Sequence, residues 1–465
     1  MNKLAKTICL LAALSLAVGC ASLSENSTRS IDTELSAQIA KTAPYKHWVT
    51  DHIADAAIAD DWALVLHDET ILGFITEALA NNPSLAASAE QVARSQAILQ
   101  QSRSSLFPSL SASGSATGTE PFENGSFSKR YSAGLSASWE VDLWGRIRNG
   151  VHSAEFDLAA SQAFYRNARE ALIAQVARTY VLAIEATQQH ELNLETLTAL
   201  ETILHIVKTR HDLGAASRRE RVLAISDVAS ARDSLEQASA NIRTSLRAFE
   251  VLLGRYPSAN VQIPTTFPDI SQVVAVGQPA DILRRRPDIQ LDEYNVQVAF
   301  ANIDTQKAAR WPSLSLSADI SGSSLELGDI LDPASLAYSV GLRLADTLFD
   351  GGLTKGRIEV AKSNGRQALA NYGQTVLDAF AEIESQIDLA AVLGRRHTYV
   401  AQSAAAARET LKLAEIQYKE GAIDLLDVLT FRQRSFQTDS TLLSIKRQQL
   451  EASITLYLAL GGTGI

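Results

Sequence analysis

The chain has 465 residues, a formal net charge of −10 and 46% hydrophobic residues. This balance is typical of a folded globular protein and not of a disordered one, and the acidic excess argues against a nucleic acid as partner. Beyond the N-terminal segment there is no run of about 20 apolar residues, so the sequence predicts no membrane-spanning helix.

Residues 1–19 are predicted to be a lipoprotein signal peptide. A basic start precedes an apolar run at 8–18, and small residues lead up to Cys20, as in a lipobox. Cys20 is therefore the expected lipidation site, and Ser22, in place of an aspartate next to it, resembles sorting to the outer membrane. The alternative is an ordinary signal peptide cleaved near Ala21. Since the one other cysteine lies within the signal, we expect no disulfide in the mature chain.

Residues 20–62 form a weakly patterned N-terminal anchor segment, in which Trp48 and Trp62 are expected to pack onto the body of the protein. A first structural repeat is predicted over 63–254. It begins with a short helix at 64–80, and Pro83 then marks the start of a new helix, because proline is favoured in a first helical turn.

A β-hairpin is predicted at about 106–142, because the residue period there changes to two. Apolar residues alternate with serines in both strands, and a loop from Thr117 to Lys129 connects them. Each strand therefore has one apolar and one serine-lined face. After Gly145 the period becomes helical, and glycine permits the sharp change of backbone direction.

A long helical hairpin is predicted at about 147–253. No proline occurs from Ile147 to His211, which indicates one helix of about 100 Å. Gly214 suits the left-handed position after this helix, and a return helix starts at Ser217. Helices of this length, rich in alanine and serine, are expected to pack as a coiled coil.

The same plan recurs after a proline-containing linker at 255–280. The second repeat covers 281–465, with a β-hairpin at about 312–346 and a helical hairpin at about 353–460. The two repeats match at offsets of 204 and then 207, which places the change between Pro108 and Tyr131. The matched landmarks are Pro83 with Pro287, Pro108 with Pro312, Tyr131 with Tyr338, Gly145 with Gly352, Gly214 with Gly421, and Gly254 with Gly461.

Strands with one apolar and one serine face suit a barrel with lipid outside and water inside. Four strands cannot close such a barrel, since about eight is the smallest practical number, so several chains would have to share one. The alternative from the alternation alone is a soluble sandwich with one solvated face.

The duplicated plan and four motifs resemble the outer membrane efflux lipoproteins of the TolC/OprM (NodT-type) family. The motifs are Leu106-Phe107-Pro108-Ser109-Leu110, Trp139-Glu140-Val141-Asp142-Leu143-Trp144-Gly145-Arg146, Leu283-Arg284-Arg285-Arg286-Pro287-Asp288-Ile289 and Leu348-Phe349-Asp350-Gly351-Gly352. The resemblance implies an α+β membrane protein: a homotrimer with a 12-stranded transmembrane β-barrel, to which each chain gives four strands, and a coiled-coil α-helical tunnel in the periplasm.

The resemblance also implies a function and partners. The chain would be the passive, gated exit duct of a tripartite efflux system in the outer membrane, lipid-anchored and extending into the periplasm. It would dock onto a periplasmic membrane-fusion adaptor and an inner-membrane pump, often a proton-driven one of the RND class. A type I secretion duct and a metal-ion efflux duct remain as alternatives, and a non-conducting periplasmic structural or adaptor lipoprotein is the alternative from another class.

The helical tips carry the predicted gate. Glu220 and Asp427 each lie six residues after the turn glycine of their hairpin. The resemblance matches Asp427 to an aspartate ring at a closed aperture, and Glu220 and Tyr418 to positions that tie neighbouring hairpins together. Asp424 is a further candidate. The alternative for these acids is a solvated helix face.

Two tip positions depart from the family pattern: Ile423 stands where some members have an arginine, and Thr430 where some have a second acid. The lock that ties the hairpins is therefore expected to be looser or differently arranged. The expected adaptor contacts at the tips are Gly214, Arg218, Arg219 and Gly421.

Enzymatic activity has no support in the sequence. The histidines are scattered, no pair of them has a helical metal-binding spacing, and the Gly-Gly at 351–352 is not a phosphate-binding loop. We therefore expect no catalytic residue, no metal and no cofactor apart from the covalent lipid on Cys20.

Overall fold

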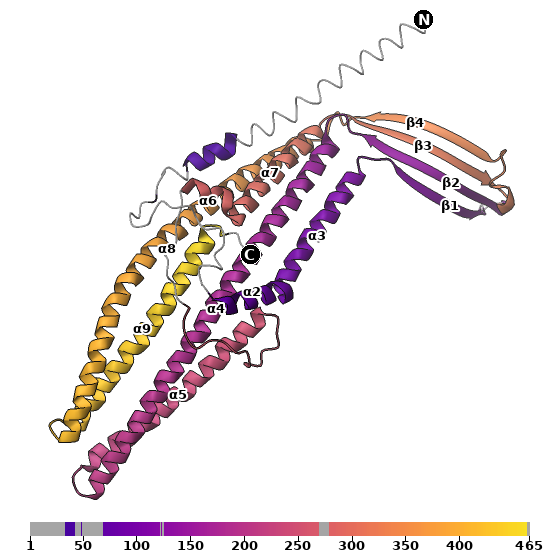
Figure 1. Cartoon of the computed structure of the whole chain (residues 1–465). Helices are drawn as coiled ribbons and strands as arrows, with labels where there is room; N and C mark the ends of the chain where they lie inside the picture. Colours follow the sequence, from indigo (N-terminus) through magenta and orange to yellow (C-terminus); the bar gives the residue numbers. More distant parts are fainter. Residues whose placement is uncertain are drawn as a thin grey trace. The chain divides into compact units, whose positions relative to one another are not determined.

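The computed structural model describes residues 33–41, 48, 68–120, 122, 125–268 and 279–462, with the side chains of 280 and 281 left out (Figure 1). The signal peptide, Cys20, Trp62 and the linker residues 269–278 lie outside the described residues. The chain forms two compact units. We call them the sheet unit, chiefly residues 90–164 and 288–376, and the hairpin unit, chiefly 165–287 and 377–465 with 68–89.

The sheet unit contains one four-stranded antiparallel sheet in the order β1-β2-β3-β4 (Figure 1). The strands are β1 (Ser109–Thr119), β2 (Ser128–Val141), β3 (Ser313–Ser324) and β4 (Leu336–Ala345). Both predicted hairpins are present, and the strands of the first extend slightly into the predicted loop. Pairing of β2 with β3 joins the two repeats into one sheet, which leaves β1 and β4 as open edges within the chain.

The two hairpins have equivalent registers. Ser109 lies opposite Ser138 in the first, and Ser313 lies opposite Ala345 in the second, which corresponds to the offsets of 204 and 207. The offset therefore changes within the connection between the strands. In the second hairpin this connection contains the short 3-10 helix η2 (Leu327–Asp329).

Long helices make up most of the rest. They are α3 (Pro83–Ser104), α4 (Arg146–Asp212), α5 (Arg218–Leu252), α7 (Pro287–Ala308), α8 (Leu353–Glu420) and α9 (Leu425–Ala459), together with the short helices α2 (Glu69–Asn81) and α6 (Pro279–Arg285). A helix at 33–41 lies in the weakly patterned segment and was not predicted. Within the described ranges, no helix combines the length and apolarity needed to cross a membrane.

The predicted change from strand to helix after β2 is stabilised by the motif around Trp144. Asp142 caps α4, since its carboxylate accepts hydrogen bonds from the backbone N–H groups of Ile147 (3.1 Å) and Arg148 (2.9 Å). Trp144 donates from its indole N–H to the carbonyl of Pro312, and Arg146 pairs with Glu140 at 2.7 Å. The motif is thus a capping and bracing device for α4.

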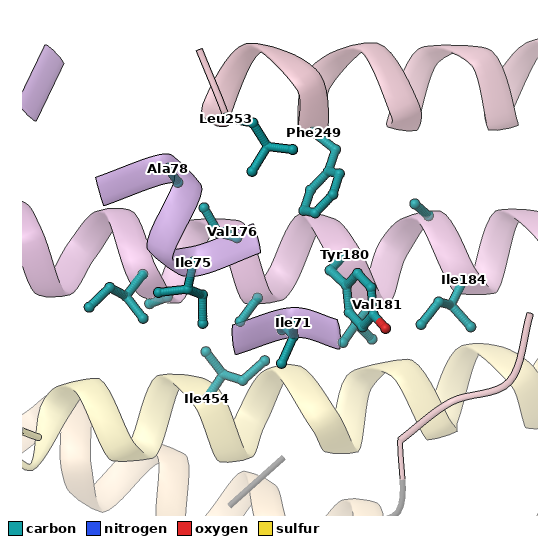
Figure 2. Close-up of a cluster of buried hydrophobic side chains, with 14 of the residues drawn as sticks. Ile71, Ile75, Ala78, Val176, Tyr180, Val181, Ile184, Phe249, Leu253 and Ile454 are labelled. Atoms are coloured by element: carbon teal, nitrogen blue, oxygen red, sulfur yellow. The ribbon is translucent and has the colours of Figure 1, made fainter. Parts of the chain in front are cut away.

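The core of the hairpin unit is an apolar cluster between α2, α4, α5 and α9 (Figure 2). Ile71 and Ile75 of α2 are fully buried in it, as are Tyr180 of α4 and Phe249 of α5. The Tyr180 hydroxyl donates a 2.6 Å hydrogen bond to Asp68, which precedes α2. The short helix α2 therefore fills the space beside the long helices and gives them a common core.

The four longest helices form two antiparallel pairs, α4 with α5 and α8 with α9 (Figure 1). Each pair has an ion pair at the same place, because the positions differ by 207 in both helices; α8 and α9 share a further ion pair, Arg432 with Glu415. Glu201 of α4 pairs with Arg232 of α5, whereas Arg408 of α8 pairs with Asp439 of α9, each at 2.6 Å. The two bridges are equivalent in position and opposite in sign.

Candidate functional site

The tips of the two helical hairpins have the same backbone geometry. Gly214 and Gly421 adopt left-handed φ values of 74° and 77°, which a residue with a Cβ rarely adopts. The residue after each glycine donates its N–H five residues back, from Ala215 to Arg210 at 2.7 Å and from Ala422 to Gln417 at 2.8 Å. Both glycines were expected at these turns, and the turns end the long helices α4 and α8.

Glu220 belongs to a capping box at the start of α5. Its carboxylate accepts the backbone N–H of Ser217 at 2.6 Å, while the Ser217 hydroxyl accepts the N–H of Glu220 at 3.2 Å. These bonds to Ser217 lower the pKa of Glu220; partial burial and the Asp424 carboxylate oppose this, and Arg219 adds to it. In the chain, Glu220 is therefore held by its own helix.

The second tip uses a different cap at the equivalent position. Asp424 is the N-cap of α9, and its side chain accepts the backbone N–H of Asp427 at 3.1 Å. Asp427 occupies the place of Glu220, yet in the part of the chain that the structure describes its carboxylate has no hydrogen bond or ion pair, and the residue is exposed. Of the predicted acids, Asp427 alone combines exposure with a free carboxylate.

Tyr418 lies in a second apolar cluster, which α4, α5, α8 and α9 form near the tips. The residue is only 6% exposed. Arg210 of α4 lies over its ring, with the guanidinium carbon 4.7 Å from the ring centroid, and donates to its carbonyl oxygen at 3.4 Å. Arg210 thus joins the end of α4 to the end of α8. It was not predicted, because it belongs to no motif and its contact joins distant residues.

The two departures from the family pattern have different surroundings. Ile423 packs against the apolar cluster of the tips, which is not possible for the charged head of an arginine. Thr430 is exposed and donates its hydroxyl to the Leu426 carbonyl at 2.8 Å. Of the expected adaptor contacts, Arg218 and Arg219 are exposed, as are both turn glycines.

The two tips present several acidic side chains close to one another. The Asp424 carboxylate lies close enough to Glu220 to act on the pKa of Glu220, which it raises. Among the described residues, no three His, Cys, Asp or Glu side chains are grouped as metal ligands. Exposed carboxylates at a helical tip can attract cations by charge alone.

Known proteins share the sequence pattern of this chain. The sequence model described as "Outer membrane efflux protein" matches residues 74–255 and 279–462. The chain is 28% identical over 404 residues to the cation efflux system protein CusC of Escherichia coli, covering 86% of this chain and 88% of that protein. It is 28% identical over 413 residues to the outer membrane protein OprJ of Pseudomonas aeruginosa, covering 86% of each.

A solved crystal structure of CusC has the same fold. The TM-score is 0.81 at 25% sequence identity, and the match covers 90% of this chain and 98% of that one. The two matched segments of the family model correspond to the two repeats.

Proposed function

The chain belongs to the outer membrane efflux protein family, and we propose that it is the gated exit duct through which a tripartite system expels small molecules. The outer-membrane efflux role follows from the family. The gate, the lipid anchor, the partners and the cargo are our proposal. The four-stranded sheet supports this proposal, because its apolar face favours contact with lipid and its open edges favour pairing with further strands.

The two faces of the sheet have opposite character. Hydroxyls pair across β1 and β2 on one face, from Ser109 to Ser138 at 2.9 Å and from Ser111 to Ser136 at 2.7 Å. The other face is apolar and open: Leu110 is 73% exposed, and Tyr338 of β4 is 84% exposed. A soluble protein rarely leaves so large an apolar surface in water, so lipid is its natural neighbour.

The open edges explain the proposed stoichiometry. Unpaired backbone groups of β1 and β4 cannot remain unsatisfied in lipid, and a closed barrel is the arrangement that satisfies them. Three chains with four strands each would give 12 strands, which supports the proposed homotrimer.

We place the gate at the helical tips, with Asp427 as the exposed acid at the aperture. Tyr418, Glu220 and Asp424 hold the tips in shape. Ile423 stands where some family members have an arginine that ties the hairpins together. In this chain Arg210, which lies over the ring of Tyr418, would take that role. The turn residues Gly214 and Gly421 and the exposed Arg218 and Arg219 would meet a periplasmic membrane-fusion adaptor, which connects the duct to an inner-membrane pump of the RND class.

We further propose that Cys20 carries the lipid that anchors the mature chain to the outer membrane. Removal of the signal peptide would leave Cys20 as the one remaining cysteine, at the start of the mature chain. This position fits the attachment of a lipid anchor. The cargo would be selected by the pump, because the duct has no group of metal-ligating residues among those described. Mass measurement of the mature N-terminus checks the lipid: an unmodified Cys20 would refute the anchor.

The proposal is tested by planar-bilayer conductance of the detergent-extracted protein, together with its oligomeric mass. We expect trimers that insert and conduct cations through a narrow aperture. Asp427→Ala should weaken block by multivalent cations several-fold, because it removes one charge per chain from the ring. Glu195→Ala, which removes an exposed acid of α4 away from the tip, is the control and should leave block unchanged.

A chain that stays monomeric and never conducts would contradict the duct. If trimers conduct and Asp427→Ala leaves both conductance and block as in the natural sequence, the duct stands and the position of the gate is wrong.

A further inference from the structure

The two repeats of one chain contact each other through α4 and α9 of the hairpin unit. Three polar contacts lie along this contact. They join Gln189 to Ser440 at 2.8 Å, Glu185 to Arg447 at 2.6 Å, and Arg178 to Thr455 at 3.1 Å. The helices involved are the first helix of one hairpin and the return helix of the other.

The duplication supplies a second pair of helices with equivalent positions. Under the offset of 207, α4 corresponds to α8 and α9 corresponds to α5. Ser440 and Thr455 of α9 are partly covered, whereas their counterparts on α5, Asp233 and Ala248, are exposed. The same holds for Gln189 of α4, which is partly covered, and its exposed counterpart on α8. The structure thus has one occupied contact and one open copy of it.

The open faces carry opposite charges. The counterpart of Gln189 on α8 is Arg396, and the counterpart of Ser440 on α5 is Asp233. In the part of the chain that the structure describes, neither has a hydrogen bond or an ion pair. The neighbouring charges, Arg395 on α8 and Glu236 on α5, are also complementary.

The other two contacts also transfer without conflict. Glu185 and Arg447 are replaced by Val392 and Ala240, which form an apolar pair. Arg178 and Thr455 are replaced by Ser385 and Ala248, which are small. No like charges meet at these three transferred pairs.

We propose that α8 of one chain packs on α5 of the next in the geometry of the α4–α9 contact, with Arg396 opposite Asp233 of that second copy. The partner is therefore another copy of this chain, joined head to tail. Such a contact uses two different surfaces of each copy, so that a closed ring satisfies all of them. The inference rests on the proposed oligomeric duct and names the residues that assemble it.

The sheet unit gives an independent prediction by the same reasoning. Within the chain β2 pairs with β3, with Leu135 opposite Ile320 and Ser136 opposite Asp319. Moving β2 by 207 and β3 by −204 places β4 of one copy beside β1 of the next. Leu342 then lies opposite Ala116 on the apolar face, and Arg343 opposite Ser115 on the serine face. Both faces stay uniform, which a shift of one residue would destroy.

Cross-linking tests both contacts. The variants are Asp233→Cys with Arg396→Cys in the helices, and Ala116→Cys with Leu342→Cys in the strands. The natural cysteines, Cys9 and Cys20, lie in and directly after the signal, so the background is low. Mild oxidation of outer membranes should give covalent trimers on non-reducing denaturing gels. Asp233→Cys with Lys412→Cys is the control, because Lys412 and its counterpart His205 are both exposed.

Charge reversal tests the ion pair without a new covalent bond. Arg396→Glu and Asp233→Arg should each raise the dissociation constant of the trimer, because each places like charges together. We expect an increase of about two- to fivefold, the range of an exposed ion pair. The double variant should restore the natural value. Lys412→Glu, on the same helix, should have no effect.

The outcomes separate the inference from the duct. Trimers seen by light scattering that neither cross-link at these pairs nor show rescue by the double reversal would overturn the inference and leave the duct in place. Monomers that do not conduct would overturn both.

Discussion

At the residue scale, Arg210 is the contact that sequence reasoning missed. It lies over a ring that is nearly buried, and it also binds the carbonyl of the same residue, Tyr418. A guanidinium over an aromatic face contributes about 0.5–2 kcal/mol, depending on how dry the site is. One side chain therefore fixes the end of α4 to the end of α8.

We expect Arg210→Ala to loosen this tie and to raise the conductance of the duct, because the helix ends can then separate more easily. Arg210→Lys should have a smaller effect, since an ammonium keeps the charge and loses the planar contact. Lys208→Ala is the matched control, because Lys208 is an exposed cation in the same turn. Equal conductance of Arg210→Ala and Lys208→Ala in planar bilayers would show that the contact does not restrain the tips.

Glu220 gives a prediction about pH. Because its pKa is lowered in the folded chain, the carboxylate stabilises the tip above its unfolded pKa of about 4.3 and loses this effect as the pH falls through the lower folded value. Glu220→Ala should speed hydrogen exchange of the first turn of α5 roughly two- to threefold at pH 7. The difference should vanish in strong acid.

Asp427→Ala is the internal control for this experiment. It occupies the same place in α9 but accepts no backbone hydrogen bond through its carboxylate within the described chain. Equal exchange rates in the natural protein and in Glu220→Ala at pH 7 would refute the role of the capping box.

The chemistry of the tip acids was only partly predictable. Ser217 followed three residues later by Glu220 is a recognisable capping signal, and it could have separated the structural acid from the free one. The Arg210 contact could not have been found in this way, because it depends on how two hairpins pack. Local signals identify caps, and tertiary packing decides which side chains meet.

At the element scale, Asp142 shows how a strand is followed directly by a long helix. Its carboxylate accepts two backbone N–H groups of the first turn of α4, which otherwise would have no partner. We expect Asp142→Ala to lower the free energy of unfolding by about 1 kcal/mol, within the range of about 0.5–2 kcal/mol for N-caps.

The effect of Asp142→Ala is measured as a shift in the denaturant midpoint of the protein in detergent. Asp346→Ala provides the comparison, since the one hydrogen bond of Asp346 among the described residues is from the N–H of Thr347, in the loop after β4. If both variants shift the midpoint equally, the cap has no special contribution.

Most elements were predictable because each has a strong local signal. The absence of proline predicted α4, and the period of two predicted the strands; glycines with positive φ mark the ends of the repeats, as at Gly254 and Gly461. Pairing of β2 with β3 was beyond local signals, since it joins residues almost 200 positions apart. The helix at 33–41 was missed because its sequence has only a weak apolar period.

At the scale of the whole molecule, the single chain exposes surfaces that are expected to need a partner. Its sheet has an open apolar face and two open edges, and its helices α5 and α8 present Asp233 and Arg396, which have no ion-pair partner among the described residues. These features occur in both units, and each can be satisfied by lipid or by further copies. Stability of the protein is therefore expected to depend on its concentration and on the membrane.

The opposite sign of the two equivalent ion pairs, Glu201 with Arg232 and Arg408 with Asp439, bears on folding errors. A chain built from two similar halves risks pairing a helix with the return helix of the wrong half while it folds. In such a mispaired hairpin Glu201 would meet Asp439, and Arg408 would meet Arg232, so both errors bring like charges together. Because the charges are exchanged between the two halves, a helix is repelled by the return helix of the wrong half, although the two return helices are similar in shape.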